Sequence, residues 1–208
     1  MRRQLMISIS REYGTDGHSV AEKIAEHLGL PLVNRNMLEE IAREKGLGED
    51  HHKQWEEHDE KPKNPLLSRT VKGHSNSMEE NLAQMQFEYM RKKADNGDSF
   101  VVLGRCSETV LAGRDGLVSI FITGHKEAKI AHVRERFGLS EKEAVFKMMR
   151  HDKSRRMYHN RHSDFKWGDS RNYDMCLNSS KLGVDGIVTM VEKYVELVYG
   201  LDDGGSSK

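Results

Sequence analysis

Apolar residues along the chain follow two spacings that alternate from segment to segment. Residues 5–10 are a short, mostly apolar run, which predicts a buried strand. Residues 19–28 place apolar side chains three and four positions apart, which predicts an amphipathic helix. Residues 11–17 lie between these two segments, contain two glycines and follow neither spacing. The chain is therefore expected to open with a strand, a glycine-containing turn and a helix.

The same alternation continues through the rest of the chain. Further strands are expected at residues 29–33, 100–103, 117–122 and 173–177. Further helices are expected at residues 34–45, 77–95, 126–137, 141–157 and 184–198, with a polar loop at 159–172. Strands that alternate with helices indicate a parallel sheet covered on both faces, which is a three-layer α/β fold.

One segment, residues 47–75, does not fit this alternation. It combines histidines, acidic and basic runs and two prolines with few apolar residues. Such a composition cannot supply a core element, so we expect a mobile insertion there. The total length of 208 residues suits one domain, or one domain with an insertion.

The order of the predicted strands places three segments on one edge of the sheet. In parallel α/β sheets, ligands bind outside the carboxyl ends of the strands. The segments that follow predicted strands directly are residues 11–19, residues 104–107 and the loop after Leu177. We therefore expect these segments to lie together and to form any site.

The charge and cysteine content exclude several classes of protein. Lysine plus arginine total 33 and aspartate plus glutamate total 33, and this balance argues against a dedicated nucleic-acid binder. No apolar run approaches the roughly 20 residues of a membrane helix. Cys106 and Cys176 are too few for a disulfide framework, and we expect both to be small buried side chains. A cytoplasmic protein without nucleic-acid or membrane partners is expected.

Glycines between the first strand and the first helix make this turn a candidate phosphate loop. Glycines let successive backbone N–H groups point inward, and the helix N-terminus behind them offers partial positive charge to an anion. The usual pattern is G-x-x-x-x-G-K-S/T. In the register that matches best, Gly17 and Ser19 fit, Glu12 stands at the first glycine and His18 stands at the lysine. An ordinary strand-to-helix turn is the alternative interpretation.

Arginines on two further segments could hold a phosphate. Arg105 directly follows the apolar run 100–103, and a guanidinium there can grip a phosphate with two parallel hydrogen bonds. A structural salt bridge is the alternative role. The basic run at residues 150–161 could close over phosphates and neutralise their charge, whereas a solvated helix face is the alternative interpretation.

Taken together, these motifs resemble the cytidylate kinase-like family, a divergent branch of the P-loop nucleoside monophosphate kinases. The matching segments, in the same order along the chain, are residues 9–17, 104–106, 152–155, 167–174 and 177–180. The resemblance covers nearly the whole chain except residues 47–75 and the tail. It implies one P-loop kinase-like domain over residues 1–200, made of a core at 1–46, 97–125 and 172–200, a helical and mobile insertion at 47–96 and a basic lid at 126–171, followed by a disordered tail at 201–208.

The resemblance also implies a reaction and a set of site residues. The reaction is phosphoryl transfer from ATP to a nucleoside monophosphate, CMP or dCMP, with Mg²⁺ on the donor phosphates and beside the Ser19 hydroxyl. The residues implied to bind the donor phosphates are Arg11, Gly14, Thr15, Asp16, Gly17, His18 and Ser19. The residues implied to act in catalysis are His18, Arg105, Lys153, Arg155 and Arg156.

Three departures from the family pattern keep other functions open. His18 stands where the family has a permanently charged lysine, and a histidine does not carry a permanent charge. Asp16 places a carboxylate beside the expected anion, and Cys106 stands where an aspartate is usual near the nucleoside. The alternatives are a non-catalytic nucleotide-binding or regulatory protein and a kinase for another small acceptor. Small-molecule nucleotides are the expected partners, and the oligomeric state is left open.

Overall fold

The computed structural model describes residues 4–34 and 78–200. The elements in chain order are β1 (Met6–Arg11), α1 (Gly17–Leu28), β2 (Leu32–Val33), α4 (Met78–Asp95), β3 (Phe100–Leu103), α5 (Ser107–Val110), β4 (Leu117–Thr123), α6 (Lys126–Phe137), α7 (Glu141–His162), a 3₁₀ turn η2 (Ser170–Asn172), β5 (Met175–Asn178) and α8 (Ser179–Tyr199). Apart from residue 34, the helix predicted at 34–45, the insertion at 47–75 and the tail at 201–208 lie outside the described residues.

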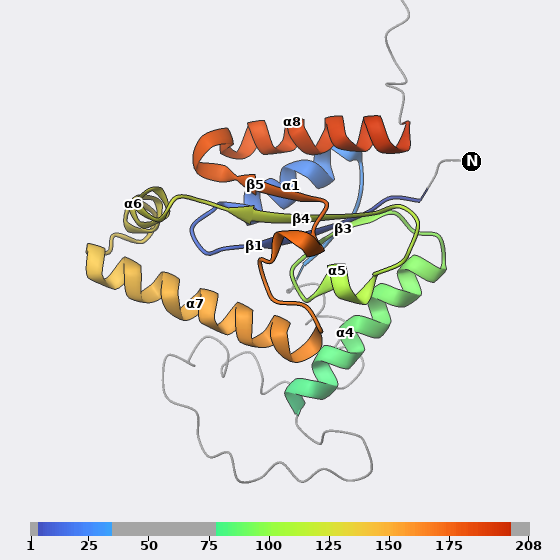
Figure 1. Cartoon of the computed structure of the whole chain (residues 1–208), viewed down its shortest axis with the longest axis horizontal. Helices are drawn as coiled ribbons and strands as arrows, with labels where there is room; N and C mark the ends of the chain where they lie inside the picture. The colour runs from blue at the N-terminus through green and yellow to red at the C-terminus, as the bar shows by residue number, and fades with distance from the viewer. Residues whose placement is uncertain (1–3, 35–77, 201–208) are drawn as a thin grey trace, which may run out of the picture.

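The five strands form one parallel sheet in the order β2-β3-β1-β4-β5. β1 lies at the centre, where Ile9 pairs with Leu103 of β3 and with Ile120 of β4. Figure 1 shows α1 and α8 over one face of the sheet and α4, α5 and α7 over the other. The predicted three-layer α/β fold is therefore confirmed, and the carboxyl ends of the strands meet on one edge.

Two cores, one on each face, hold the layers together because successive side chains of a strand point to opposite faces. The core under α1 and α8 includes Ile7, Ile9, Ile24, Ile187 and Val191. The core on the opposite face includes Met6, Phe87, Met90, Phe100 and Val102. The same alternation separates the last two residues of β1. Ser10 shares the face of Met6, and Arg11 shares the face of Ile9, on the side of α1.

α7 is longer than the sequence pattern indicated. It begins with a capping box, in which Ser140 Oγ accepts from the Glu143 backbone N–H (3.4 Å) and Glu143 Oε2 accepts from the Ser140 backbone N–H (2.9 Å). It continues to His162, so the loop predicted from residue 159 was wrong for the last helical turn. The physical reason is His159, whose buried ring lies 2.7 Å from Glu108 Oε1 and holds this turn on the body of the protein.

The two cysteines differ in exposure. Cys106 is buried as expected, whereas Cys176 is exposed, so the expectation of a buried side chain was wrong for Cys176. The reason is its position on β5, an edge strand that pairs with β4 alone. Across the described ranges, no helix combines the length and the apolar character needed to cross a bilayer.

Candidate phosphate-binding site

The loop that joins β1 to α1 has the backbone of an anion cradle. Gly14 has a φ of 83° and Asp16 a φ of 54°, so both residues take the left-handed conformation. A side chain at Gly14 would be strained and crowded, because the φ is positive and a Cβ there would lie 3.0 Å from Val133 Cγ2 and 3.1 Å from the Lys129 carbonyl. α1 begins at Gly17, directly behind the loop. Its N-terminus therefore offers unpaired N–H groups and partial positive charge at the sheet edge.

Glu12 fastens this loop to the edge of the sheet. Its Oε2 accepts hydrogen bonds from Lys129 Nζ (2.7 Å), Thr123 Oγ1 (2.8 Å) and the Gly124 backbone N–H (3.2 Å). The Thr15 hydroxyl donates to the Glu12 carbonyl at 2.8 Å and closes the turn from within. The carboxylate is thus held by α6 and by the end of β4.

Asp16 is also paired with α6. Its Oδ1 lies 3.0 Å from His132 Nε2 and 3.6 Å from Arg136 Nη1. The sequence suggested that this carboxylate stands beside the anion site and opposes binding. In the structure this carboxylate has two cation-forming partners on α6, which offset its charge. Both acidic residues of the loop therefore have positively charged or protonatable partners.

Arg11, the last residue of β1, sends its side chain through the space between α1 and β3. A Cβ on Gly17 would lie 2.6 Å from Arg11 Cγ, and a Cβ on Gly104 would lie 2.6 Å from Arg11 Nη1. Burial, followed by the charges of Arg155 and Arg105, lowers the pKa of Arg11 to about 9. No carboxylate of the described residues lies within ion-pair distance of this guanidinium. Arg11 is a half-buried cation with like charges around it.

Arg155 joins this cluster from α7. Its Nη1 donates to the Arg11 carbonyl at 3.1 Å and lies 3.6 Å from Asp152 Oδ1. Its guanidinium carbon lies 5.5 Å from the centre of the Tyr13 ring, within the range of a cation–π contact. α7 therefore delivers a positive charge to the start of the phosphate loop.

Arg105 joins the cluster from the end of β3 through a strained turn. Gly104, Arg105 and Cys106 have φ values of 77°, 62° and 52°, three left-handed residues in succession. For each non-glycine residue this conformation costs about 1–2 kcal/mol, and such strain is kept at functional sites. The Arg105 guanidinium carbon lies 5.2 Å from the centre of the Tyr158 ring. The turn thus aims a guanidinium at the sheet edge.

Two further contacts dock α7 onto the loop. Asp152 Oδ1 accepts a hydrogen bond from the Tyr13 backbone N–H at 2.7 Å, and burial raises the pKa of Asp152. The His151 ring stacks on the Tyr13 ring, with centres 4.4 Å apart and planes 5° from parallel. Burial, with Arg155 and other cations, lowers the pKa of His151 to about 4, so the stacked ring is neutral at neutral pH.

A buried polar network lies beneath the cluster. Glu108 of α5 accepts from the hydroxyls of Ser8 (3.4 Å) and Ser10 (3.3 Å), and its other oxygen lies 2.7 Å from His159 Nε2. Ser8 Oγ and Ser107 Oγ are 2.6 Å apart. The network links β1, α5 and α7, and so fixes the three elements that carry the arginines. Sequence reasoning missed it, although two serines in an otherwise apolar strand were a signal for buried polar partners.

The remaining predicted site residues lie outside the cluster. His18 is exposed on α1, where its Nε2 lies 3.2 Å from Glu22 Oε1. Ser19 lies in the first turn of α1 and is half-buried. Lys153 is exposed on α7, and the exposed Arg156 places its guanidinium carbon 5.7 Å from the centre of the Trp167 ring. The structure therefore brings Arg11, Arg105 and Arg155 together, and separates His18 and Lys153 from them.

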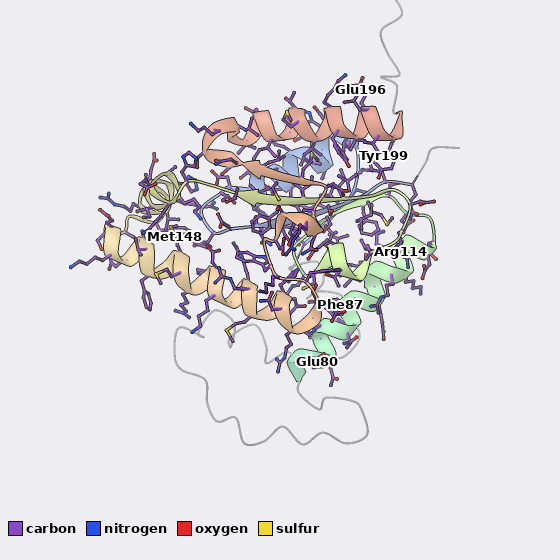
Figure 2. The ribbon with its side chains drawn as sticks, viewed as in Figure 1. Glu80, Phe87, Arg114, Met148, Glu196 and Tyr199 are labelled. Carbon is purple, nitrogen blue, oxygen red and sulfur yellow. The ribbon has the colours of Figure 1, made fainter. Side chains whose placement is uncertain are left out.

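An open hollow of about 480 Å³ lies between α4, α5 and the C-terminal end of α7. Glu80 and Phe87 of α4, both labelled in Figure 2, contribute to its wall, together with Thr109 and His162. The His162 ring centre lies 4.7 Å from that of Tyr158, whose ring also contacts Arg105. The hollow is thus separated from the arginine cluster by about one aromatic ring.

The fold and the site define a class of protein. A parallel sheet whose central strand leads through a glycine-containing loop into a helix, with arginines converging on that edge, is a P-loop kinase arrangement. The sequence model of the cytidylate kinase-like family matches residues 6–181, and the chain belongs to this family. A curated relative, named cytidylate kinase, from Pyrococcus horikoshii is 24% identical over 208 residues, covering 99% of this chain and 95% of the relative.

Solved structures share the fold. A crystal structure of an uncharacterized protein from Eubacterium ventriosum is 36% identical, with a TM-score of 0.73 over 93% of this chain and 99% of that chain. A gluconokinase from Sinorhizobium meliloti has a TM-score of 0.56 at 12% identity, covering 96% of each chain. A shikimate kinase from Bacteroides thetaiotaomicron has a TM-score of 0.52 at 10% identity, covering 92% of this chain and 98% of that chain. Family and fold support a nucleotide-binding phosphotransferase of the kinase type.

Proposed function

We propose that the protein transfers a phosphoryl group from ATP to a nucleoside monophosphate, with CMP or dCMP as the first candidates. The observation that carries the proposal is the convergence of Arg11, Arg105 and Arg155 on one edge of the sheet. Among the described residues these three guanidiniums have one carboxylate contact, Asp152 at 3.6 Å from Arg155. The surplus positive charge suits a multiply charged phosphate. Membership of the family and the name of the Pyrococcus relative support the nucleotide acceptor.

The three arginines approach the edge from three segments, which suits a site for two phosphate-bearing substrates. Donor phosphates would bind the N–H groups between Gly14 and Ser19, and the acceptor phosphate would bind Arg105. The Arg11 side chain runs from Gly17 on the donor side to Gly104 on the acceptor side, and Arg155 contacts the Arg11 carbonyl. In phosphoryl transfer the protein acts mainly by positioning the substrates and neutralising charge, and fixed cations at the junction do both.

The loop suits Mg²⁺ that binds together with ATP and takes most of its oxygen ligands from the phosphates and water. Among the residues that the structure describes there is no cluster of three or more histidine, cysteine, aspartate or glutamate side chains able to hold a metal. Mg²⁺ is commonly held by one or two protein oxygens plus substrate phosphates, so a complete protein cage is not needed. The Ser19 hydroxyl is the proposed protein contact. When bound, the ion would neutralise charge on the donor oxygens.

This chain has Cys106 where an aspartate near the nucleoside is usual in the family, so it has to select its acceptor by other contacts. The Cys106 side chain is buried and its Sγ lies 3.9 Å from the His159 carbonyl. Burial, with Glu108 nearby, raises the pKa of this thiol, so it stays neutral and cannot bind a base amino group as a carboxylate does. We propose that the hollow beside Tyr158 receives the acceptor. A kinase for another small acceptor is the second candidate, and the neutral thiol favours it.

An acceptor panel tests the proposal. Purified protein with Mg·ATP is offered CMP, dCMP, UMP, AMP, gluconate and shikimate, and products are separated by chromatography. We expect a nucleoside diphosphate from CMP or dCMP, and a loss of about 100-fold in kcat/KM for Arg105→Gln. Arg114→Gln, at the opposite end of the strands (Figure 2), is the matched control and should leave the rate unchanged. Tight ATP binding without product on any acceptor would instead support the non-catalytic alternative.

A further inference from the structure

The backbone of the loop matches the phosphate-loop pattern in a register different from the one that the residue types favour. Asp16 has a φ of 54°, in the left-handed region that favours glycine, and α1 begins at the next residue, Gly17. If Asp16 stands at the second glycine of G-x-x-x-x-G-K-S/T, then Arg11 stands at the first glycine, Gly17 at the lysine and His18 at the serine or threonine. Ser19, the Mg²⁺ contact proposed above, then lies one residue beyond the usual hydroxyl position, in the same first turn of α1. In this register the loop lysine is replaced by a glycine, and the first glycine by an arginine.

The two replacements occupy one another's space. A Cβ on Gly17 would lie 2.6 Å from Arg11 Cγ and 2.8 Å from Arg11 Cβ, closer than side-chain carbons approach. A lysine at position 17 and an arginine at position 11 therefore exclude each other. The Arg11 side chain, which starts from β1, therefore occupies the space that the side chain of a lysine at position 17 would enter from α1.

We propose that Arg11 supplies the fixed cation that a lysine at position 17 supplies in the usual phosphate loop, and that its guanidinium contacts donor and acceptor phosphates together. The inference rests on the proposed function and deepens it, because it assigns the central charge of the same site.

The position of the guanidinium supports a contact with both substrates. Its Nη1 lies against Gly104, since a Cβ on that glycine would be only 2.6 Å away. Gly104 directly precedes Arg105, the residue proposed to bind the acceptor phosphate. Its stem lies on Gly17, the first residue of the helix on the donor side. A guanidinium has five N–H donors in a fixed plane and can bind two oxygens in parallel, whereas an ammonium is a single point of charge.

The charge state of Arg11 suits this role, and the position of His18 does not. A pKa of about 9 keeps Arg11 protonated at neutral pH. His18, the residue that sequence matching placed at the lysine, has a side chain 52% exposed and pairs with Glu22 on the outer surface of α1. The cation that acts on the phosphates is therefore on β1 and not on α1.

A charge-transplant experiment tests the inference. The variants are Arg11→Gly, Arg11→Gln, Arg11→Gly combined with Gly17→Lys, and Arg114→Gln as the surface control. For each, kcat and KM are measured with Mg·ATP and the best acceptor, and the Kd of inorganic tripolyphosphate is measured by calorimetry. Circular dichroism and Tm verify that each variant is folded.

We expect both single variants at position 11 to lose about 100-fold to 1,000-fold in kcat, as for removal of a transition-state donor, and about tenfold in tripolyphosphate affinity. The transplanted lysine should recover at least tenfold of the lost kcat. A folded Arg11→Gly or Arg11→Gln protein with kcat within threefold of wild type would overturn the inference, as would a folded double variant no faster than Arg11→Gly. If the wild type transfers phosphate to no acceptor, the proposed function fails, and the tripolyphosphate affinities alone decide whether Arg11 is the anion-binding cation.

Discussion

Replacing Arg11 with methionine should make the protein more stable while abolishing its phosphate site. Arg11 is half-buried, adjoins two other guanidiniums, and has no carboxylate within ion-pair distance among the described residues. Methionine keeps an unbranched apolar stem of similar length across Gly17 and removes the charge. The stabilisation would follow from removing a cation that the folded protein keeps for its ligand.

The lowered pKa sets the size of the effect. A fall from the ordinary pKa of arginine to about 9 corresponds to roughly 5 kcal/mol of unfavourable interaction with the charged form, at about 1.4 kcal/mol for each tenfold change. Replacement of buried ion pairs by well-packed apolar residues is neutral or stabilises proteins by about 1–4 kcal/mol, and a half-buried cation without a carboxylate partner is expected to follow the same direction. We therefore expect Arg11→Met to raise the free energy of unfolding by about 1–3 kcal/mol, and Tm by about 3–8 °C for a chain of this length.

The sign of the pH dependence follows from the same pKa. Above about pH 9 the folded protein releases the Arg11 proton, whereas the unfolded chain, in which arginine has its ordinary higher pKa, keeps it. This group therefore raises stability as pH rises further. The advantage of Arg11→Met over wild type should be constant below about pH 8 and should shrink above pH 9. Urea unfolding at pH 7, 8, 9 and 10 in chloride buffer measures it, and the comparison with wild type cancels the titration of other groups.

Two results would refute this reasoning. A loss of more than 1 kcal/mol in Arg11→Met would mean that Arg11 holds the fold together and is not kept for a ligand. Equal stabilisation of wild type and variant by millimolar tripolyphosphate would mean that the anion binds elsewhere, since a ligand raises stability only through the state that binds it.

Three further predictions concern single positions. Gly104→Ala should weaken tripolyphosphate binding at least tenfold by calorimetry, because its Cβ would displace Arg11 Nη1. The control is Gly29→Ala, where φ is 62° and nothing lies within 4 Å, so this variant should show backbone strain alone and bind tripolyphosphate normally. His159→Leu should lower the free energy of urea unfolding by about 2–4 kcal/mol, since it leaves the buried Glu108 without its ring partner; a loss below 0.5 kcal/mol would show that the contact is unimportant. A maleimide should label one thiol per native chain, at the exposed Cys176, and two after unfolding; labelling of two thiols in the native protein would contradict the burial of the other cysteine.

Most of the fold was predictable because the spacing of apolar residues indicates where the strands and helices lie. The apolar run at residues 100–103 became β3 with those bounds, and the run at 117–122 became β4 with one more residue. What spacing could not show was the end of α7. That turn is stabilised by the buried His159 and its contact with Glu108, a residue far away in the sequence. A run of polar residues after a helix predicts a loop, because the sequence does not show which distant residue these side chains contact in the fold.

The site was predictable in position but not in its charges. Parallel strands bring their carboxyl ends to one edge, so Arg11, Arg105 and the basic run of α7 could be placed together in advance. The direction of individual side chains could not be read from sequence. His18 looked like the lysine by position, yet it points to Glu22, and Asp16 looked repulsive, yet it pairs with α6. The contact of His18 with Glu22 is a local i,i+4 pair within α1, whose spacing is visible in the sequence. The pairing of Asp16 depends on the packing of α6 against the loop, which the pattern along the chain does not contain.

A crystal structure with Mg·ADP and CMP bound tests the central claim most directly. We expect phosphate oxygens within hydrogen-bonding distance of Arg11, Arg105 and Arg155, with the ADP phosphates on the N–H groups ahead of α1. A polyphosphate lodged at any other surface, with these guanidiniums left in contact with protein alone, would contradict it.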